Sequence, residues 1–216
     1  LQIYGRIEDL IGRTVASFED DIQTEFPDGR PPTGVSLFQK NIPLEKGRYK
    51  LTLVTRDAVS GKVSTTENLL VIPELDPEKL AVSSIVLTRR VEETPRSTSM
   101  GDPFVFGKYK VVPVEDSQFQ REEQFVQAYF EVYNLQLDSG NLAPSPRVEL
   151  TLRHDGKEVF PFSKIDTEYE YAGDRLLVYK TLPFAGLRQG TYTVRFRVTD
   201  EISGQTVEPE VSFQIE

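Results

Sequence analysis

The stretch GRYKLTLVTRDAVSGKVSTTENLLVI at residues 47–72 returns in altered form as GTYTVRFRVTDEISGQTVEPEVSFQI at residues 190–215. The two stretches align without a gap at a constant offset of 143 residues, and seven of their 26 positions are identical. Both consist of Gly-x-Tyr, an alternating segment, an Asp-x-x-Ser-Gly motif and a second alternating segment. A duplication, or a shared hairpin architecture without common ancestry, would explain the match, and both predict the same local structure.

Apolar and polar residues alternate on both sides of the Asp-x-x-Ser-Gly motif, as in residues 192–198. Successive side chains of a strand point to opposite faces, so this period predicts strands with one buried and one solvated face. Antiparallel sheets are typical of that pattern. In the motif itself, Asp57 and Asp200 can accept hydrogen bonds from backbone N–H groups, while Gly61 and Gly204 can adopt the positive φ that closes a hairpin.

Tyr49 and Tyr192 stand near the start of the first strand of each repeat. This position resembles the tyrosine corner of immunoglobulin-like sandwiches, in which the phenol bonds to the backbone while the ring packs inside. Because each repeat ends its own unit, we predict an all-β fold of two tandem immunoglobulin-like or fibronectin-III-like antiparallel β-sandwiches. The expected bounds are residues 1–72 for the first sandwich, 73–82 for a Pro-rich charged linker and 83–216 for the second sandwich.

The first unit is expected to be incomplete at its N-terminus. Its pattern predicts five strands, one of them at Val35–Ile42, where an immunoglobulin-like sandwich usually has seven. The chain also begins with Leu1 and shows no signal-type apolar run, so we expect a mature portion or an excised part of a longer protein. Missing strands would leave an open sheet edge that a strand from a partner could join.

The composition excludes several classes of function. The chain has 25 Lys and Arg against 34 Asp and Glu, a formal net charge of −9, which disfavours binding to a nucleic-acid backbone. Without any Cys it can form neither disulfides nor an iron–sulfur site, and a single His cannot form a multi-histidine metal site. No run of apolar residues approaches the length that spans a bilayer, so we expect no membrane insertion.

Several short motifs lie within residues 37–160: Pro43–Leu51 with Arg56-Asp57, Leu80–Leu87, Gly101–Tyr109 and Tyr129–Asn134. These motifs resemble the C-terminal β-region of acidobacterial secreted proteins labelled von Willebrand factor A-related, and similar modules occur beside the GWxTD domain. The resemblance implies an accessory sandwich array on an exported protein, periplasmic or secreted. The metal-binding Asp-x-Ser-x-Ser motif of the von Willebrand A domain does not occur here, so no metal-site residue is implied.

Catalytic chemistry has little support in the sequence. His154 precedes Asp155-Gly156 and is expected to be an exposed turn residue, with no Ser placed beside it for a catalytic triad. Glu168 and Glu170 would share one strand face, in environments too alike to separate a general acid from a general base. We therefore expect no enzyme activity and no catalytic residue; a hydrolase is the remote alternative.

Calcium is the ion that the acidic loops would suit best. Asp57 and Asp200 in the turns, with Glu74, Asp76 and Glu78 in the linker, could supply oxygen ligands at a junction between sandwiches. None of them has the spacing of a calcium-binding loop. We predict turn capping and a charged linker instead, and no cofactor.

Four aromatic residues are candidates for a binding surface. Tyr169 and Tyr171 alternate along one strand, and Phe104 and Phe106 follow a long loop. Core packing would explain most of these aromatics, and binding to a sugar or a partner is the alternative. The long loops Glu92–Pro103 and Leu137–Pro146 are the first places to look for function, because long loops in compact domains often carry it.

Together these observations predict a non-catalytic accessory module, either a structural spacer or a protein-interaction module. Its partner would be another protein or a neighbouring domain of the parent chain. A carbohydrate-binding module with a polysaccharide partner is the alternative.

Overall fold

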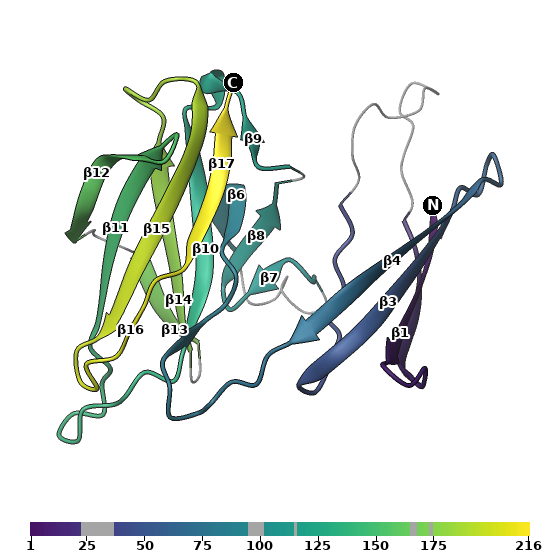
Figure 1. Cartoon of the computed structure of the whole chain (residues 1–216), viewed down its shortest axis with the longest axis horizontal. Helices are drawn as coiled ribbons and strands as arrows, with labels where there is room; N and C mark the ends of the chain where they lie inside the picture. Colours follow the sequence, from purple (N-terminus) through teal and green to yellow (C-terminus); the bar gives the residue numbers. More distant parts are fainter. Residues whose placement is uncertain (23–36, 95–101, 115, 165–167, 173–174) are drawn as a thin grey trace. The chain divides into compact units, whose positions relative to one another are not determined.

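The computed structural model describes residues 1–22, 37–94, 102–114, 116–164, 168–172 and 175–216 (Figure 1). The fold is all-β and built mainly from antiparallel sheets, which confirms the predicted all-β antiparallel class. The chain divides into unit 1, Leu1–Glu74, and unit 2, Leu75–Glu216. Most of the segment expected to be a linker therefore belongs to unit 2.

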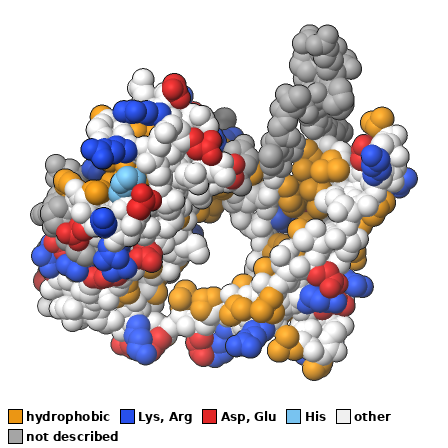
Figure 2. Space-filling view, turned by 45° about the horizontal axis from the view of Figure 1, so that its top comes forward, with side chains coloured by type: hydrophobic (Ala, Val, Ile, Leu, Met, Phe, Trp, Pro, Cys, Tyr) orange, Lys and Arg blue, Asp and Glu red, His pale blue; other side chains and the backbone are white. Residues whose placement is uncertain are grey.

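Unit 1 contains one four-stranded antiparallel sheet. Its strands are β1 (Gln2–Asp9), β2 (Thr14–Asp21), β3 (Gly47–Arg56) and β4 (Val63–Ile72), in the order β2-β1-β3-β4. Ile3 and Ile7 of β1 are buried on the face of the sheet that is also lined by Leu51 and Leu53 of β3. Hydrophobic side chains also gather at the surface of this unit, as Figure 2 shows.

A second sheet is not present among the described residues of unit 1, so the expected sandwich is not found there. Residues 37–45, which include most of the predicted strand Val35–Ile42, form no strand. Pro43 lacks the N–H that a ladder needs. The side chains of this segment instead pack against the sheet. The ring of Phe38 stacks on that of Phe18, with the ring centroids 6.0 Å apart, and Ile42 lines an apolar pocket of about 300 Å³.

Unit 2 consists of two sheets (Figure 1). The first contains β5 (Ala81–Val82), β6 (Val86–Glu93), β7 (Val105–Phe106), β8 (Tyr109–Pro113), β10 (Phe125–Tyr133), β13 (Glu168–Ala172) and β14 (Arg175–Pro183). The second contains β9 (Gln118–Phe119), β11 (Pro146–His154), β12 (Lys157–Lys164), β15 (Gly190–Asp200), β16 (Thr206–Val207) and β17 (Glu210–Ile215). A short 3-10 helix, η1 (Arg121–Glu123), leads from β9 into β10.

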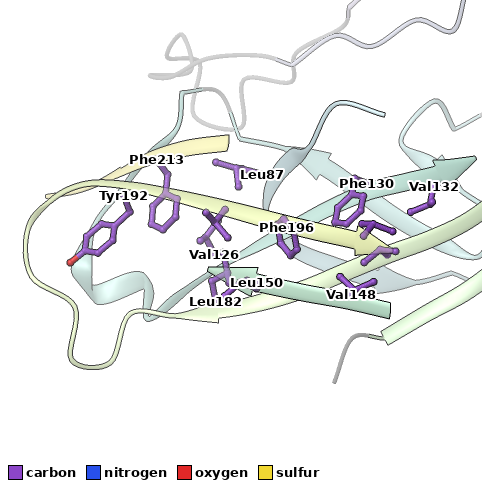
Figure 3. Close-up of a cluster of buried hydrophobic side chains, with 14 of the residues drawn as sticks. Leu87, Val126, Phe130, Val132, Val148, Leu150, Leu182, Tyr192, Phe196 and Phe213 are labelled. Atoms are coloured by element: carbon purple, nitrogen blue, oxygen red, sulfur yellow. The ribbon is translucent and has the colours of Figure 1, made fainter. Parts of the chain in front are cut away.

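The hydrophobic core of unit 2 lies between these two sheets (Figure 3). Val126, Phe130 and Val132 of β10 are fully buried and meet Phe196 of β15, whose ring centroid is 5.0 Å from that of Phe130. The alternating pattern of β15 buries every second residue, as expected for a strand with one solvated face. Unit 2 is therefore a two-layer sandwich.

The two repeats form hairpins with the same register and the same turn. Strands β3 and β4 pair Gly47 with Ile72, and β15 and β17 pair Gly190 with Ile215. Each turn is organised by its aspartate. The Asp57 carboxylate accepts hydrogen bonds from Val59 N and the Ser60 hydroxyl. The Asp200 carboxylate accepts the corresponding bonds from Ile202 N and the Ser203 hydroxyl. Gly61 and Gly204 close the turns at φ values of 70° and 73°.

Both tyrosines bond to the backbone four residues upstream. Tyr49 Oη donates to Glu45 O at 3.0 Å, and Tyr192 Oη donates to Arg188 O at 3.0 Å while accepting from Arg188 N at 2.9 Å. Both rings are buried. This is the geometry of a tyrosine corner, and it occurs once in each unit.

Tyr192→Phe is expected to lower the free energy of unfolding of unit 2 by about 1–2 kcal/mol, because it leaves two backbone groups of Arg188 without their partner. Tyr49→Phe removes one bond instead of two, so its effect on unit 1 is expected to be smaller. Urea unfolding of the two variants, followed by NMR signals from each unit, checks the prediction. Equal losses, or a loss in the unit that was not altered, would contradict it.

The segment that enters unit 2 is fixed to the sandwich by two side-chain amides. Asn134 Nδ2 donates to the carbonyl oxygens of Asp76 and Lys79, at 3.0 and 2.9 Å. Gln205 accepts a hydrogen bond from Leu80 N at 2.9 Å and donates one to Glu78 O at 3.0 Å. These bonds explain why the segment, although rich in charge and proline, packs as part of unit 2.

Candidate binding site

An open pocket of about 540 Å³ lies at one end of the unit 2 sandwich. Its walls come from the connection between β10 and β11 and from the β13–β14 hairpin. We call it the end pocket, and it is lined by Asn134, Leu135, Leu137, Leu142, Ala143, Pro144, Tyr171 and Arg175. The predicted functional loop Leu137–Pro146 and the candidate Tyr171 are thus brought together at one site.

The loop between β10 and β11 is held in shape by its own hydrogen bonds. Asp138 Oδ1 accepts from Gly140 N and Asn141 N, and the backbone of Asp138 bonds to Leu142 N and Ala143 O, all at 2.9–3.1 Å. Leu142 takes a left-handed backbone conformation with φ of 55°, which is uncommon for a residue other than glycine. The loop therefore presents its side chains in one fixed arrangement.

Two leucine side chains stand out of this loop into solvent. Leu142 is 72% exposed and Leu137 is 51% exposed. Burying such a side chain against a partner is worth about 1.5–3 kcal/mol. A loop that is already ordered loses little conformational entropy on binding, so more of this energy is available for affinity.

Arg175 of the end pocket belongs to an ion pair that is supported by two phenols outside the pocket lining. Arg175 Nη1 donates to Glu131 Oε2 at 2.9 Å. Tyr133 Oη donates to the same oxygen at 2.6 Å, and Tyr129 Oη donates to Oε1 at 3.1 Å. Glu131 is 5% exposed, so its charge is held by these three donors away from water.

The environment shifts the pKa values of the two phenols and of Arg175. Burial, with the hydrogen bond to Glu131 and the charge of that residue, raises the pKa of Tyr133 to about 12. Burial and the charge of Glu131 also raise the pKa of Tyr129. The hydrogen bond to Glu131 raises the pKa of Arg175. At neutral pH both phenols are therefore donors and the guanidinium is charged, so Arg175 is held in place at the rim of the pocket.

Phe104 and Phe106 do not join the end pocket. The pairing of β6 with β8 has a register shift between Thr88 and Val91. Phe106 of β7 packs on the outer face of the first sheet, away from the core between the sheets. There the ring of Phe106 packs on that of Tyr129 at 5.5 Å. Phe104 is half-buried, and its carbonyl accepts a hydrogen bond from Val111 N. Phe106 therefore contributes to packing, which is the interpretation that the sequence favours for most of these aromatics.

Tyr171 is 46% exposed at the end pocket. Tyr169 pairs with Val178 in the β13–β14 ladder, and its side chain lies outside the described part of the molecule. The only other tyrosine among the exposed large hydrophobic residues that are described is Tyr4, which belongs to unit 1. A flat strip of tyrosines, as a polysaccharide platform would need, is therefore not seen among the described side chains.

Four of the five acidic residues considered for calcium, Asp57, Glu74, Asp76 and Asp200, have side chains that bond to other partners. Besides its turn bonds, Asp200 accepts a hydrogen bond from Gln136 N at 3.0 Å, and Asp76 bonds to Glu78 N and pairs with Lys79. In the parts of the chain that are described, no group of three or more His, Cys, Asp and Glu side chains could hold a metal ion.

His154 differs from the exposed turn residue that the sequence predicts. It is the last residue of β11, and its ring stacks on Tyr192 with centroids 4.5 Å apart. Its Nε2 is 3.2 Å from Gln189 O. The histidine therefore supports the tyrosine corner of unit 2, a role that only the pairing of β11 with β15 reveals.

The described residues include no helix that could cross a membrane. No model of a known protein family matches the chain, and a comparison with curated proteins found no match. The likeness to the β-region of von Willebrand factor A-related secreted proteins accordingly stays a prediction from short motifs.

Proposed function

We propose that the chain is a non-catalytic protein-interaction module of an exported bacterial protein, and that it binds its partner through the end pocket. The observation that carries the proposal is the pair of exposed leucines, Leu137 and Leu142, on a hydrogen-bonded loop beside an apolar pocket. Exposed apolar groups on a rigid support are typical of protein contact sites. Arg175 at the rim adds a charged group of the kind that often anchors such contacts.

The non-catalytic part of the proposal is supported by the chemistry of the titratable groups. His154 stacks on Tyr192, and the buried carboxylate of Glu131 is held by Arg175 and two phenols. Within the described parts of the chain, neither side chain hydrogen-bonds to the side chain of a Ser, Thr or Lys. The periplasmic or secreted location rests on the family resemblance alone.

A carbohydrate-binding module is the second candidate function. Tyr171 favours it, because an exposed phenol beside Asn134 and Arg175 could stack on a sugar ring while the polar groups bond to its hydroxyls. The two candidates differ in the residues on which they depend. Sugar binding requires Tyr171, whereas protein binding requires the leucines of the loop.

The test compares the wild-type chain with the double variant Leu137→Lys, Leu142→Lys. We expect the wild-type chain to capture a protein from extracts of the source cells and the double variant to fail to capture it. The double variant should bind the purified partner at least about 100-fold more weakly, because two leucine contacts are lost. Val159→Lys, at a 51% exposed position of β12, is the matched control and should bind normally. Equal binding by all three proteins would contradict the proposal. Retention on a polysaccharide column that Tyr171→Ala abolishes would favour the carbohydrate alternative.

A further inference from the structure

We propose that the outer edge of β4 in unit 1, which we call the β4 edge, binds an extended strand of a partner protein. Among the described residues β4 pairs with β3 alone, so its other side presents unpaired backbone groups. This surface belongs to unit 1 and shares no residue with the end pocket, so the inference does not rest on the proposed function of unit 2.

The β4 edge lacks the features that protect other edges of the same chain. Proteins block edge pairing with charges, prolines, bulges or very short strands. The edge strand β2 carries Glu19, Asp20 and Asp21, and the edge strand β12 carries Pro161 and has register shifts against β11. Strand β4 has ten residues in unbroken register with β3, no proline, and Glu67 as its one charge.

The second repeat shows how such an edge is covered. Strand β17 occupies the place of β4, and its outer side pairs in parallel with β9. Gln214 N donates to Ser117 O at 2.8 Å. At the repeat offset of 143 residues, Gln214 corresponds to Val71, so the N–H of Val71 points away from β3 as well. The same holds for alternate residues along the strand, which leaves a row of outward donors and acceptors on β4.

One difference between the repeats limits where a strand can add. Glu216 N donates to Phe119 O at 3.0 Å, but the corresponding residue of the first repeat is Pro73, which has no N–H. A strand that joins β4 must therefore bond to residues before Pro73. That leaves the row from Val63 to Val71.

The side chains along this row define the chemistry of the partner strand. Val63, Leu69 and Val71 are 60%, 66% and 57% exposed on one face of the sheet. Glu67 on the same face receives only long contacts of 3.4 Å from Lys50 and Thr52. A matching strand carries apolar residues beside Leu69 and Val71 and a cation beside Glu67, because cross-strand neighbours of like character or opposite charge stabilise a sheet.

A second copy of this chain fits the β4 edge poorly. Antiparallel strands place residues of one face directly opposite each other. Self-pairing would set Glu67 against Glu67 of the other copy or, one step along, against Leu69 or Thr65. The first arrangement opposes like charges, and a shift toward Leu69 puts a carboxylate against an aliphatic side chain. A shift toward Thr65 gives Glu67 a hydroxyl as its neighbour and supplies no cation. The occupant that fits is a separate polypeptide with a basic residue in its strand.

The experiment measures amide hydrogen exchange of the full chain with and without synthetic strand peptides of about nine residues. One peptide alternates Thr and Val around a central Lys, and the control peptide has Glu at that position. We expect the Lys peptide to slow exchange at the outward amides of β4. The Glu peptide should bind at least about tenfold more weakly than the Lys peptide. Glu67→Lys should reverse this preference.

Val71→Pro removes an outward N–H that β3 does not use and should weaken binding of the Lys peptide by about tenfold or more. Val71→Thr keeps the N–H and should bind the Lys peptide at least about tenfold more tightly than Val71→Pro does. Unchanged protection of the β3–β4 ladder in both variants shows that unit 1 is folded. The proposal is wrong if the Lys peptide does not bind, if Val71→Pro binds it as well as Val71→Thr, or if Glu67→Lys leaves the peptide preference unchanged. It is also wrong if sedimentation shows a dimer that Val71→Pro dissociates, because the occupant is then a second copy.

Discussion

Replacing Phe196 with alanine is expected to lower the free energy of unfolding of unit 2 by about 3–5 kcal/mol. The ring is fully buried and lies 5.0 Å from that of Phe130, so it joins the two sheets at the centre of the sandwich. Its removal takes away apolar burial and leaves a cavity that the strands on either side cannot close. Urea unfolding monitored by NMR signals of unit 2 measures the loss.

Phe160→Ala is the matched control for this prediction. The side chain of Phe160 is 47% exposed on β12, so the same change of residue there should cost less than about 1 kcal/mol. A similar loss for the two variants would mean that the core does not lie between the sheets as described.

Asp200→Ala has the second largest expected effect, a loss of about 2–4 kcal/mol from unit 2. The residue is fully buried, and its carboxylate accepts hydrogen bonds from Gln136 N, Ile202 N and the Ser203 hydroxyl, at 3.0, 3.0 and 2.6 Å. Removing the carboxylate leaves these donors unpaired. Asp57→Ala is the control in the matching turn, and its effect on unit 1 should be smaller because Asp57 is partly exposed and has no contact like that with Gln136.

The same residue predicts the pH dependence of unit 2. Burial alone would raise the pKa of Asp200, but the hydrogen bonds from Ser203, Gln136 and Ile202 outweigh it and lower the pKa below its ordinary value of 3.8. The ionised carboxylate therefore stabilises the folded state, fully above that ordinary value, and the contribution is lost as the pH falls through the lowered pKa. Asp200→Asn should flatten this acid-side loss in a pH series of thermal unfolding. An unchanged slope would exclude Asp200 as its source.

The hairpins were predictable because the signals that form them are local. A period of two residues, an aspartate that caps a turn and a glycine at positive φ act within a few residues of each other, so the sequence alone indicates both copies. The long strands of unit 2, such as β10 and β15, follow from the same alternation. The sequence did not predict that unit 1 has a single sheet, because Phe38 and Ile42 belong to a type of residue that is common in strands. In the structure they pack against the sheet from a segment that forms no β-ladder.

The candidate site was predictable only in part. Loop length and the spacing of Tyr171 pointed to the end pocket, but nothing in the sequence marked Glu131 as buried. Alternation places Glu131 on the outer face of its strand, which the simple pattern treats as solvated. Its burial depends on Tyr129, Tyr133 and Arg175, and on the hairpin that packs Phe106 against Tyr129. The contacts of Arg175 with Glu131 and of Phe106 with Tyr129 join residues far apart in the chain, and such contacts leave no periodic signal.

The central claim is that each tyrosine-cornered hairpin completes its own unit. Amide hydrogen exchange on the full-length Phe196→Ala variant tests it most directly, because exchange reports the opening of each hairpin separately. We expect protection in β15 and β17 to fall by about two to three powers of ten, and protection in β3 and β4 to stay as in the wild type. A fall in both hairpins together would show that they share one cooperative core and would contradict the claim.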